Sequence, residues 1–407
     1  PSSILSSSSV TSISSSIRSA FIRSASKLID ANLSYNEDND EEIEDEDEKS
    51  SHNHRHLKSG ELCPETWFLR DKENATLMAG IPYCSSHDLK KPHPEITRVI
   101  IVQHGRGYNP ITYFNGMLDA VNLAGTKEQT LVLAPQVVRF KYLQATPTLD
   151  PNYFLQFDKY WVFGSNDSKP FRKSVFDLID RILELLEKSK QQGNLPNLKT
   201  TVMVGHGGGA QFVQRYALAS RVIPRNFRMR YIVMNPSTYC WLDDERPWTL
   251  YDNDDDDYDD DTDAVIERIC PKYDNWGYGL NTERTLKFEF QDGDAERMRS
   301  FYRKRDVVYL LGEKDTWTYP RSIVDSTCPA MLQGKNRFER GQNFYKSIQR
   351  VYDTDDDSKI HRLDTVPGVG HNHEQMMEHE ASWPYIFGVG EDDDEKEEDD
   401  DYSAENE

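Results

Sequence analysis

The sequence has no apolar run of about 18 residues or more, the length at which a membrane-spanning helix is considered. Its basic residues are also outnumbered by acidic ones, 48 against 70. Such an excess of negative charge repels phosphate backbones, and no stripe of basic and aromatic residues offsets it. The composition therefore argues against a transmembrane segment and against nucleic-acid binding.

Cysteines are few, and the five present form neither a CxxC redox motif nor a zinc-ligand spacing. Cys270 and Cys328 each precede a proline in loop-like segments, so these two could pair, as could Cys63 with Cys84. Both pairings are hypotheses at this stage. A catalytic dithiol and a cysteine-ligated metal are disfavoured.

The first 28 residues are rich in serine and contain no Asp or Glu. Three basic residues are spaced through Ile, Ala and Phe, a pattern that a targeting peptide shares with a flexible tail. Sequons at Asn74, Asn166 and Asn32 would permit glycosylation in a secretory compartment, although such triplets also arise by chance. Both interpretations are open, and so is the localisation.

Three tracts, 36–48, 252–263 and 391–407, hold 10, 9 and 12 Asp or Glu residues and a single Lys. Their combined charge of −30 exceeds the formal net charge of −22, so the rest of the chain is net positive. Runs of like charge cannot bury enough apolar surface to offset the entropy lost on ordering. We therefore expect a disordered Ser-rich and acidic tail over 1–60 and a disordered acidic tail over 391–407.

Between these tails, residues 61–390 alternate between strand-like and helix-like segments. Apolar runs predict buried strands at 98–102, 130–134, 201–204, 231–234, 307–311 and 360–366. Helical spacing of apolar residues predicts helices over 174–188, 113–121 and 211–218. The alternation predicts an α/β fold with a mainly parallel sheet and flanking helices. The long interval 238–305 between two strands is interpreted as an inserted cap.

The strand predicted at 201–204 runs directly into the turn Gly205-His206-Gly207-Gly208-Gly209, and a helix follows. This context is typical of the nucleophile elbow G-x-S-x-G, in which a sharp turn lifts a serine above the sheet. Gly207 occupies the position of that serine. Because glycine has no side chain, a covalent intermediate cannot form there.

Two further candidate residues follow in the order nucleophile, acid, histidine that is typical of this elbow. Asp315 lies in a loop after the strand 307–311, and His371 follows the strand 360–366 through a Gly-rich loop. A carboxylate bonded to one ring nitrogen of the histidine would aim the other at position 207. The sequence therefore predicts an intact acid–base pair beside an absent nucleophile.

An oxyanion hole is built from backbone N–H groups, which side-chain substitutions leave in place. The candidate donors are Gly208, directly after the nucleophile position, and Gly105 and Arg106, in the turn after strand 98–102. A small ester or acyl compound is the expected ligand, and no cofactor is expected. The sequence does not indicate the oligomeric state.

Other interpretations of these motifs are weaker. Ala210 breaks the G-x-G-x-x-G spacing of a phosphate-binding loop, and no acidic residue stands about 20 positions further on. His371 and His373, with His206, are open as metal ligands, but two histidines separated by one loop residue are common. The tract 252–263 lacks the central Gly and terminal Glu of a calcium loop. We therefore assign no metal to these motifs.

Taken together, several segments between about 95 and 390 resemble a poorly characterised group of serine hydrolases in the α/β-hydrolase superfamily. The elbow of that group typically reads G-H-S-A-G-G-Q, and this chain departs from it with Gly207 for Ser, Gly208 for Ala and Ala210 for Gly. The segments that carry the resemblance are His104-Gly105, 205–217, 270–280, 312–315, Gln333-Gly334 with Arg337 and Arg340-Gly341, and 368–371.

The resemblance implies an esterase-like ancestry, and the glycine implies impaired catalysis. The resulting expectation is a pseudo-hydrolase that binds an ester-like or acyl ligand. One alternative is an active esterase in which Asp315 and His371 activate water directly. A second is an acidic interaction protein that acts through its charged tails.

Overall fold

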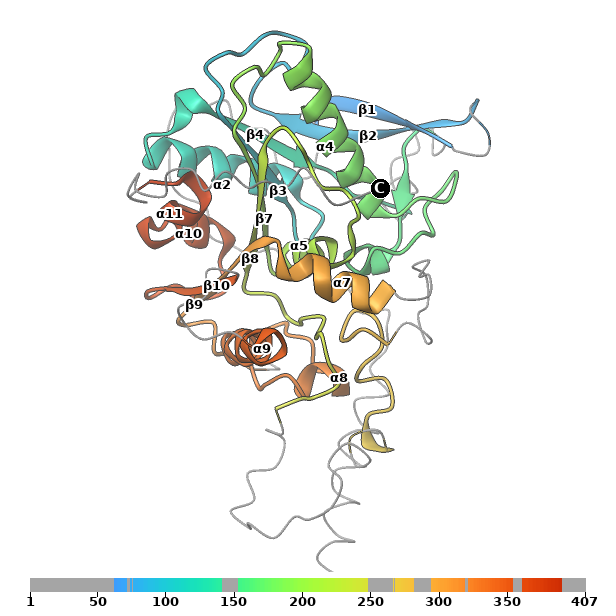
Figure 1. Ribbon diagram of the computed structural model, residues 1–407, viewed down its shortest axis with the longest axis vertical. Coiled ribbons are helices and arrows are strands. Elements are labelled where there is room, and N and C mark those ends of the chain that lie inside the picture. Colours follow the sequence, from blue (N-terminus) through green and yellow to red (C-terminus); the bar gives the residue numbers. More distant parts are fainter. Residues whose placement is uncertain are drawn as a thin grey trace, which may run out of the picture.

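A central sheet lies between two layers of helices in the computed structural model (Figure 1). The structure describes residues 62–71, 74, 76–140, 153–247, 266, 268–281, 294–318, 321–353 and 361–389. The predicted tails 1–60 and 391–407 and the acidic tract 252–263 lie outside the described residues.

The sheet has eight strands in the order β1-β2-β4-β3-β7-β8-β9-β10. β2 is antiparallel to both of its neighbours, and every other adjacent pair is parallel. The strands are β1 (Glu65–Arg70), β2 (Met78–Ser85), β3 (Arg98–Gln103), β4 (Thr130–Pro135), β7 (Thr200–His206), β8 (Arg228–Met234), β9 (Asp306–Gly312) and β10 (His361–Val366). A separate two-stranded sheet pairs β5 (Val138–Arg139) with β6 (Gln156–Phe157). All six strands predicted from the sequence are present.

Apolar clusters show which helices cover each face of the sheet. One face packs against α4 (Val175–Gln191), α5 (Gly208–Ala219), α7 (Asp294–Arg303) and α9 (Arg337–Tyr352). The other packs against α2 (Pro110–Leu123), α10 (His373–Glu378) and α11 (Trp383–Phe387). The short elements are α8 (Cys328–Met331), η1 (Lys127–Gln129), η2 (Lys159–Phe163) and η3 (Glu380–Ser382).

The local sequence explains these elements. In β3, Val99 and Ile101 join the core under α4, while Ile100 and Val102 join the core under α2, as the two-residue period of a strand dictates. Helix α4 begins at a capping box in which Ser174 and Asp177 satisfy each other's backbone N–H groups. Helices α2 and α5 begin three residues before the predicted ranges.

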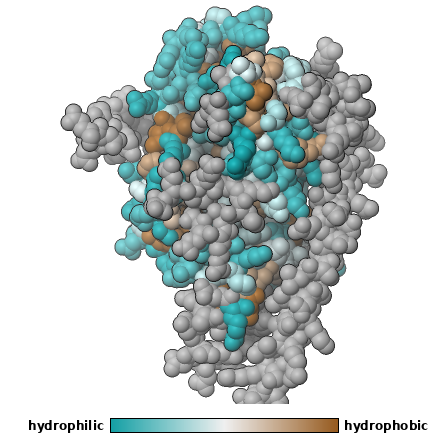
Figure 2. Space-filling view, turned by 90° about the vertical axis from the view of Figure 1, so that its right-hand side faces the viewer, coloured by the Kyte–Doolittle hydropathy of each residue, from teal (hydrophilic) through white to brown (hydrophobic). Residues whose placement is uncertain are grey.

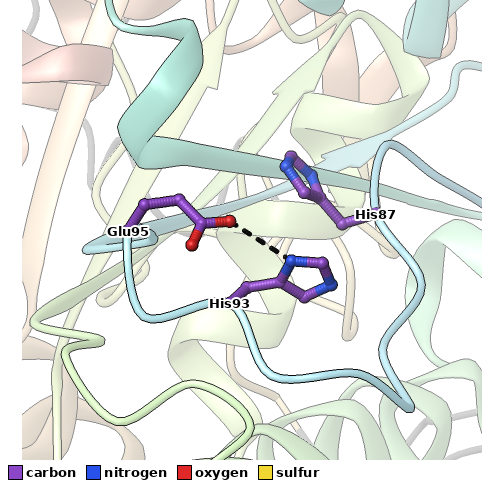
Figure 3. Close-up of side chains that lie close together, drawn as sticks. All are labelled: His87, His93 and Glu95. Carbon is purple, nitrogen blue, oxygen red and sulfur yellow. Dashed lines mark hydrogen bonds and ion pairs between the residues drawn. The ribbon is translucent and has the colours of Figure 1, made fainter.

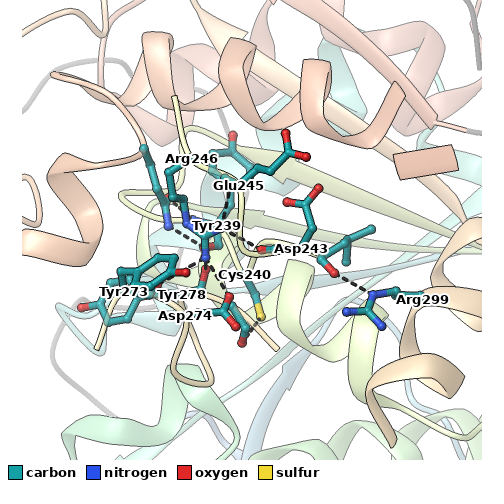
Figure 4. Close-up of polar contacts among 12 residues, drawn as sticks. Tyr239, Cys240, Asp243, Glu245, Arg246, Tyr273, Asp274, Tyr278 and Arg299 are labelled. Atoms are coloured by element: carbon teal, nitrogen blue, oxygen red, sulfur yellow. Dashed lines mark hydrogen bonds and ion pairs between the residues drawn. The ribbon is translucent and has the colours of Figure 1, made fainter. Parts of the chain in front are cut away.

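The described part of the interval 238–305 contains a buried arginine, Arg246 (Figure 4). Its guanidinium lies 2.9 Å from a carboxylate oxygen of Asp274 and donates to the carbonyls of Tyr273 and Tyr278. These contacts join residues 238–247 to residues 268–281. The last part of the interval, α7, packs against α5. The cap itself stays a prediction, since 248–265, 267 and 282–293 lie outside the described residues.

Two disulfides are present, Cys63–Cys84 and Cys270–Cys328, which are the two pairings left open by the sequence. Cys240 is buried and free. Among the described residues, no helix combines the length and the apolarity that crossing a membrane requires. On the face seen in Figure 2, the apolar surface of the described residues lies in small separate patches among hydrophilic ones.

Candidate active site

Gly207 lies at the sharp turn between β7 and α5, with φ 56° and ψ −114°. Its N–H donates to the carbonyl of Met234 at the end of β8, and its carbonyl accepts from the N–H of Gln211 in α5. The backbone is therefore held in a conformation that L-residues rarely adopt. Glycine adopts this conformation without strain, whereas the serine that a nucleophile elbow carries at such a strand-to-helix turn would be strained.

The glycines two positions on either side are required for a different reason. A Cβ on Gly205 would lie 2.4 Å from the backbone carbonyl group of Gly209, and one on Gly209 would lie 2.3 Å from the carbonyl oxygen of Gln103. At Gly207 the nearest atom to such a Cβ is Nε2 of His371, at 3.2 Å. A side chain at position 207 would therefore point at His371, whose ring would have to shift by a few tenths of an ångström to accommodate it.

His371 and Asp315 form the predicted acid–base pair. Nδ1 of His371 lies 2.7 Å from Oδ2 of Asp315, and the side chains are 32% and 2% exposed. A carboxylate accepts a hydrogen bond, so Nδ1 carries the proton and Nε2 is left as an acceptor facing position 207. The pair comes from the loops after β9 and β10, which are adjacent parallel strands.

Two residues that the sequence analysis did not assign hold this pair in place. Arg337, at the start of α9, lies 3.4 Å from Oδ1 of Asp315, and both side chains are almost fully buried. Asn235, just after β8, accepts from the N–H of Gly312 and donates to the carbonyl of Gly370, next to His371. Each contact joins segments far apart in the chain.

Two further histidines, His206 and His373, lie near His371. His206 lies 4.4 Å from His371 between ring centroids, and His373 stacks on Tyr113 at 4.1 Å. Burial, with the charges of His371, His373 and Arg337, holds the pKa of His206 well below its ordinary range. Burial, with the charge of His371, lowers the pKa of His373 to about 4. Both imidazoles are therefore neutral near pH 7.

The segments expected to supply an oxyanion hole approach each other. A Cβ on Gly208 would lie 3.0 Å from the backbone nitrogen of Arg106, and Gly208 is the first residue of α5, where N–H groups have no intrahelical acceptor. His104 shapes the turn at Gly105, since its Nδ1 bonds the Gly105 carbonyl and its Nε2 accepts from Val137. The oxyanion hole itself stays a prediction.

The sheet order and the arrangement of the three loops define the class of protein. The loops that hold Gly207, Asp315 and His371 follow β7, β9 and β10 in turn, and nucleophile, acid and histidine follow one another in this order in α/β-hydrolases. Together with a mostly parallel sheet whose second strand is antiparallel, this is the α/β-hydrolase fold. The protein has that fold, and a glycine, Gly207, occupies the turn between β7 and α5.

No protein-family model matches the sequence, and no curated protein matches it significantly. Similar solved structures include poly(aspartic acid) hydrolase-1 from Sphingomonas sp. KT-1, with 18% identity over 77% of this chain and 96% of that one and a TM-score of 0.48. The poly(3-hydroxybutyrate) depolymerase LpqC from Bordetella parapertussis has 17% identity over 80% and 89% and a TM-score of 0.48. An S-formylglutathione hydrolase from Agrobacterium tumefaciens has 11% identity over 81% and 100% and a TM-score of 0.39. Likenesses this distant assign no activity.

Proposed function

We propose that this protein is a pseudo-hydrolase that binds a small ester or acyl compound at a site whose acid–base pair persists without a nucleophile. The observation that carries the proposal is the position of Nε2 of His371, 3.2 Å from where a Cβ on Gly207 would stand. Loss of the serine removes the covalent step. The other groups that would recognise a carbonyl and its leaving group are side chains and backbone atoms that the substitution does not touch.

The ligand class follows from those groups. Backbone N–H groups at Gly208 and at Gly105 or Arg106 would bind a carbonyl oxygen, and the N-terminal end of α5 favours partial negative charge there. Neutral His206 and His373 add no positive charge that would select an anion. These features favour an uncharged ester or acyl group over a phosphate or a carboxylate.

Restoring the nucleophile tests this assignment. Hydrolysis of p-nitrophenyl acetate and p-nitrophenyl butyrate is measured for the protein, His371→Ala, Gly207→Ser, Gly207→Ser with His371→Ala, and Gly207→Ala. The alanine variant carries the same backbone strain as serine but no nucleophile. We expect Gly207→Ser alone to gain activity, on the order of 10²-fold or more, and His371→Ala to remove that gain.

Two outcomes would contradict the proposal in different ways. If the unmodified protein hydrolyses the esters and His371→Ala abolishes that activity, the Asp315–His371 pair activates water and the protein is an esterase. If folded Gly207→Ser stays inactive on both esters, the assignment of the site itself is wrong.

A further inference from the structure

A second cluster of chemically active side chains lies away from this pocket, in the loop of residues 86–97 between β2 and β3. His87, His93 and Glu95 each offer one potential metal-ligating atom, and these atoms all lie within 4.8 Å of one another. Figure 3 shows the two imidazoles and the carboxylate close together on this loop. They belong to none of the motifs identified from the sequence.

The loop backbone is fixed by contacts with neighbouring segments. The N–H of His93 donates to the carbonyl of Asn194 at 2.7 Å, and the side-chain amide of Asn197 donates to the carbonyl of Pro94 at 2.8 Å. At the start of the loop, the N–H of Ser86 donates to the carbonyl of Val132 in β4 at 3.0 Å. The three side chains therefore project from an ordered frame.

The hydrogen bonds of His93 orient its ring. Its Nε2 lies 2.9 Å from the carbonyl oxygen of Asp88, which can only accept, so Nε2 carries a proton. In the neutral ring, Nδ1 is then a lone pair that faces Oε1 of Glu95 at 3.3 Å. Two acceptors that face each other require either a second proton on His93 or a cation between them.

His87 has a similar arrangement. Its Nδ1 lies 2.8 Å from Oγ of Ser86, and when Nδ1–H donates there, Nε2 is left as a lone pair. A metal-bound histidine is commonly oriented in this way, by donating its other N–H to an oxygen nearby. Both histidines thus have an oxygen partner of the kind that holds a ligating ring.

We propose that His87, His93 and Glu95 bind a divalent transition-metal ion such as Zn²⁺, with water completing the coordination. Two imidazoles and a carboxylate are a ligand set that zinc accepts in a tetrahedral site. Ligand atoms around zinc stand roughly 3.4 Å apart, given bond lengths of about 2.1 Å. In the structure the three ligand atoms lie within 4.8 Å of one another, so they would have to move closer together to bind the ion. Modest rotation of the side chains, which are exposed or half-buried, would bring them there.

The position of the site in the fold indicates its role. The loop leads into the first residue of β3, whereas the turn at Gly105 and Arg106 follows that strand's last residue. The proposed metal and the pocket therefore lie at opposite ends of β3. The metal would cross-link the connection between β2 and β3 and stabilise the folded state without entering the chemistry at His371.

The test uses a chain carrying His52→Ala, His54→Ala and His56→Ala, since those three histidines, close in sequence, could also take up metal. Zn²⁺ alone is titrated by calorimetry, and Co²⁺ is followed by its visible absorption. We expect one Zn²⁺ per chain, a rise in melting temperature with Zn²⁺, and a loss of affinity of about tenfold or more in His93→Ala.

Glu95→Gln is the second site variant, because Glu95 is exposed and glutamine keeps its size while removing the charge. Asp88→Asn is the matched control, since it removes a charge from the same loop while leaving the Asp88 carbonyl in place. The proposal is overturned if the parent chain binds no Zn²⁺, if His87→Ala with His93→Ala binds it as tightly as the parent, or if Asp88→Asn weakens binding as much as Glu95→Gln.

Discussion

His371 and Asp315 are 2.7 Å apart, nitrogen to oxygen, with the carboxylate buried and the ring half-exposed. In a serine hydrolase this pair withdraws a proton from the nucleophile. Here the same geometry faces a glycine, so the proton-accepting nitrogen has no hydroxyl to act on. The predictions below separate what this arrangement does for stability from what it could do for chemistry.

Gly207→Ala should destabilise the protein, by about 1 to 3 kcal/mol, because a non-glycine residue at φ 56° and ψ −114° is strained. The added Cβ also contacts His371 at 3.2 Å. Urea unfolding followed by circular dichroism measures the change.

Gly125→Ala is the matched control, since Gly125 has φ 67° and a Cβ there meets no atom within 4 Å. Both positions have a positive φ, but only the variant at position 207 adds a contact with His371. A smaller loss of stability at position 207 than at position 125 would contradict the geometry of the site.

Arg337→Ala should lower the free energy of unfolding by about 3 to 5 kcal/mol, because it leaves Asp315 buried without its cationic partner. Arg350→Ala is the control. Arg350 pairs with Asp243 and Glu245 at the surface, where such pairs contribute about 0 to 1 kcal/mol. Equal effects of the two substitutions on urea unfolding would show that Arg337 does not neutralise Asp315.

Much of this site follows from local sequence. A strand–glycine-rich turn–helix pattern identified Gly207, and loops after predicted strands identified Asp315 and His371. The structure brings those three together, because parallel strands end at the same edge of a sheet. The eight-strand order and the antiparallel β2 did not follow, since they depend on pairing between segments far apart.

The roles of Arg337 and Asn235 could not be predicted from local sequence. Arg337 and Asn235 act through contacts with Asp315, Gly312 and Gly370, each more than 20 residues away. His87, His93 and Glu95 did carry a signal in their spacing. Such spacing predicts little in a loop, where neither strand nor helix period indicates that side chains converge.

Removing the Cys63–Cys84 disulfide by serine substitution at both positions should destabilise the fold by about 3 kcal/mol, the loop-entropy expectation for a separation of 21 residues. The bond joins the residues before β1 to β2, so its loss removes a covalent link at the edge of the sheet, where β1 remains hydrogen-bonded to β2. Thermal unfolding measures the change. A reductant should then lower the melting temperature of the unmodified protein more than that of the double variant, and equal shifts would show that the bond does not contribute.

Stability should fall as the pH falls from about 6.5 to about 4, because burial lowers the pKa of His104, His361 and His373 to about 4. Between those values the unfolded chain binds protons that the folded chain does not. The free energy of unfolding therefore rises with pH across this window. Above the window, the contribution of these histidines to stability has reached its full value. Each such histidine contributes a slope of about 1.4 kcal/mol per pH unit.

His361→Gln isolates one of these contributions, since His361 lies away from the pocket, bonded to Tyr309 and to the carbonyl of Tyr302. Urea unfolding at several pH values should give a slope smaller by about 1.4 kcal/mol per pH unit between pH 4 and 6. Tyr345→Phe is the control, because it removes a hydrogen bond to the His361 carbonyl and leaves the titrating ring. It should lower stability by a similar amount at every pH. An unchanged slope in His361→Gln would mean that this ring is protonated as readily in the folded chain as in the unfolded one.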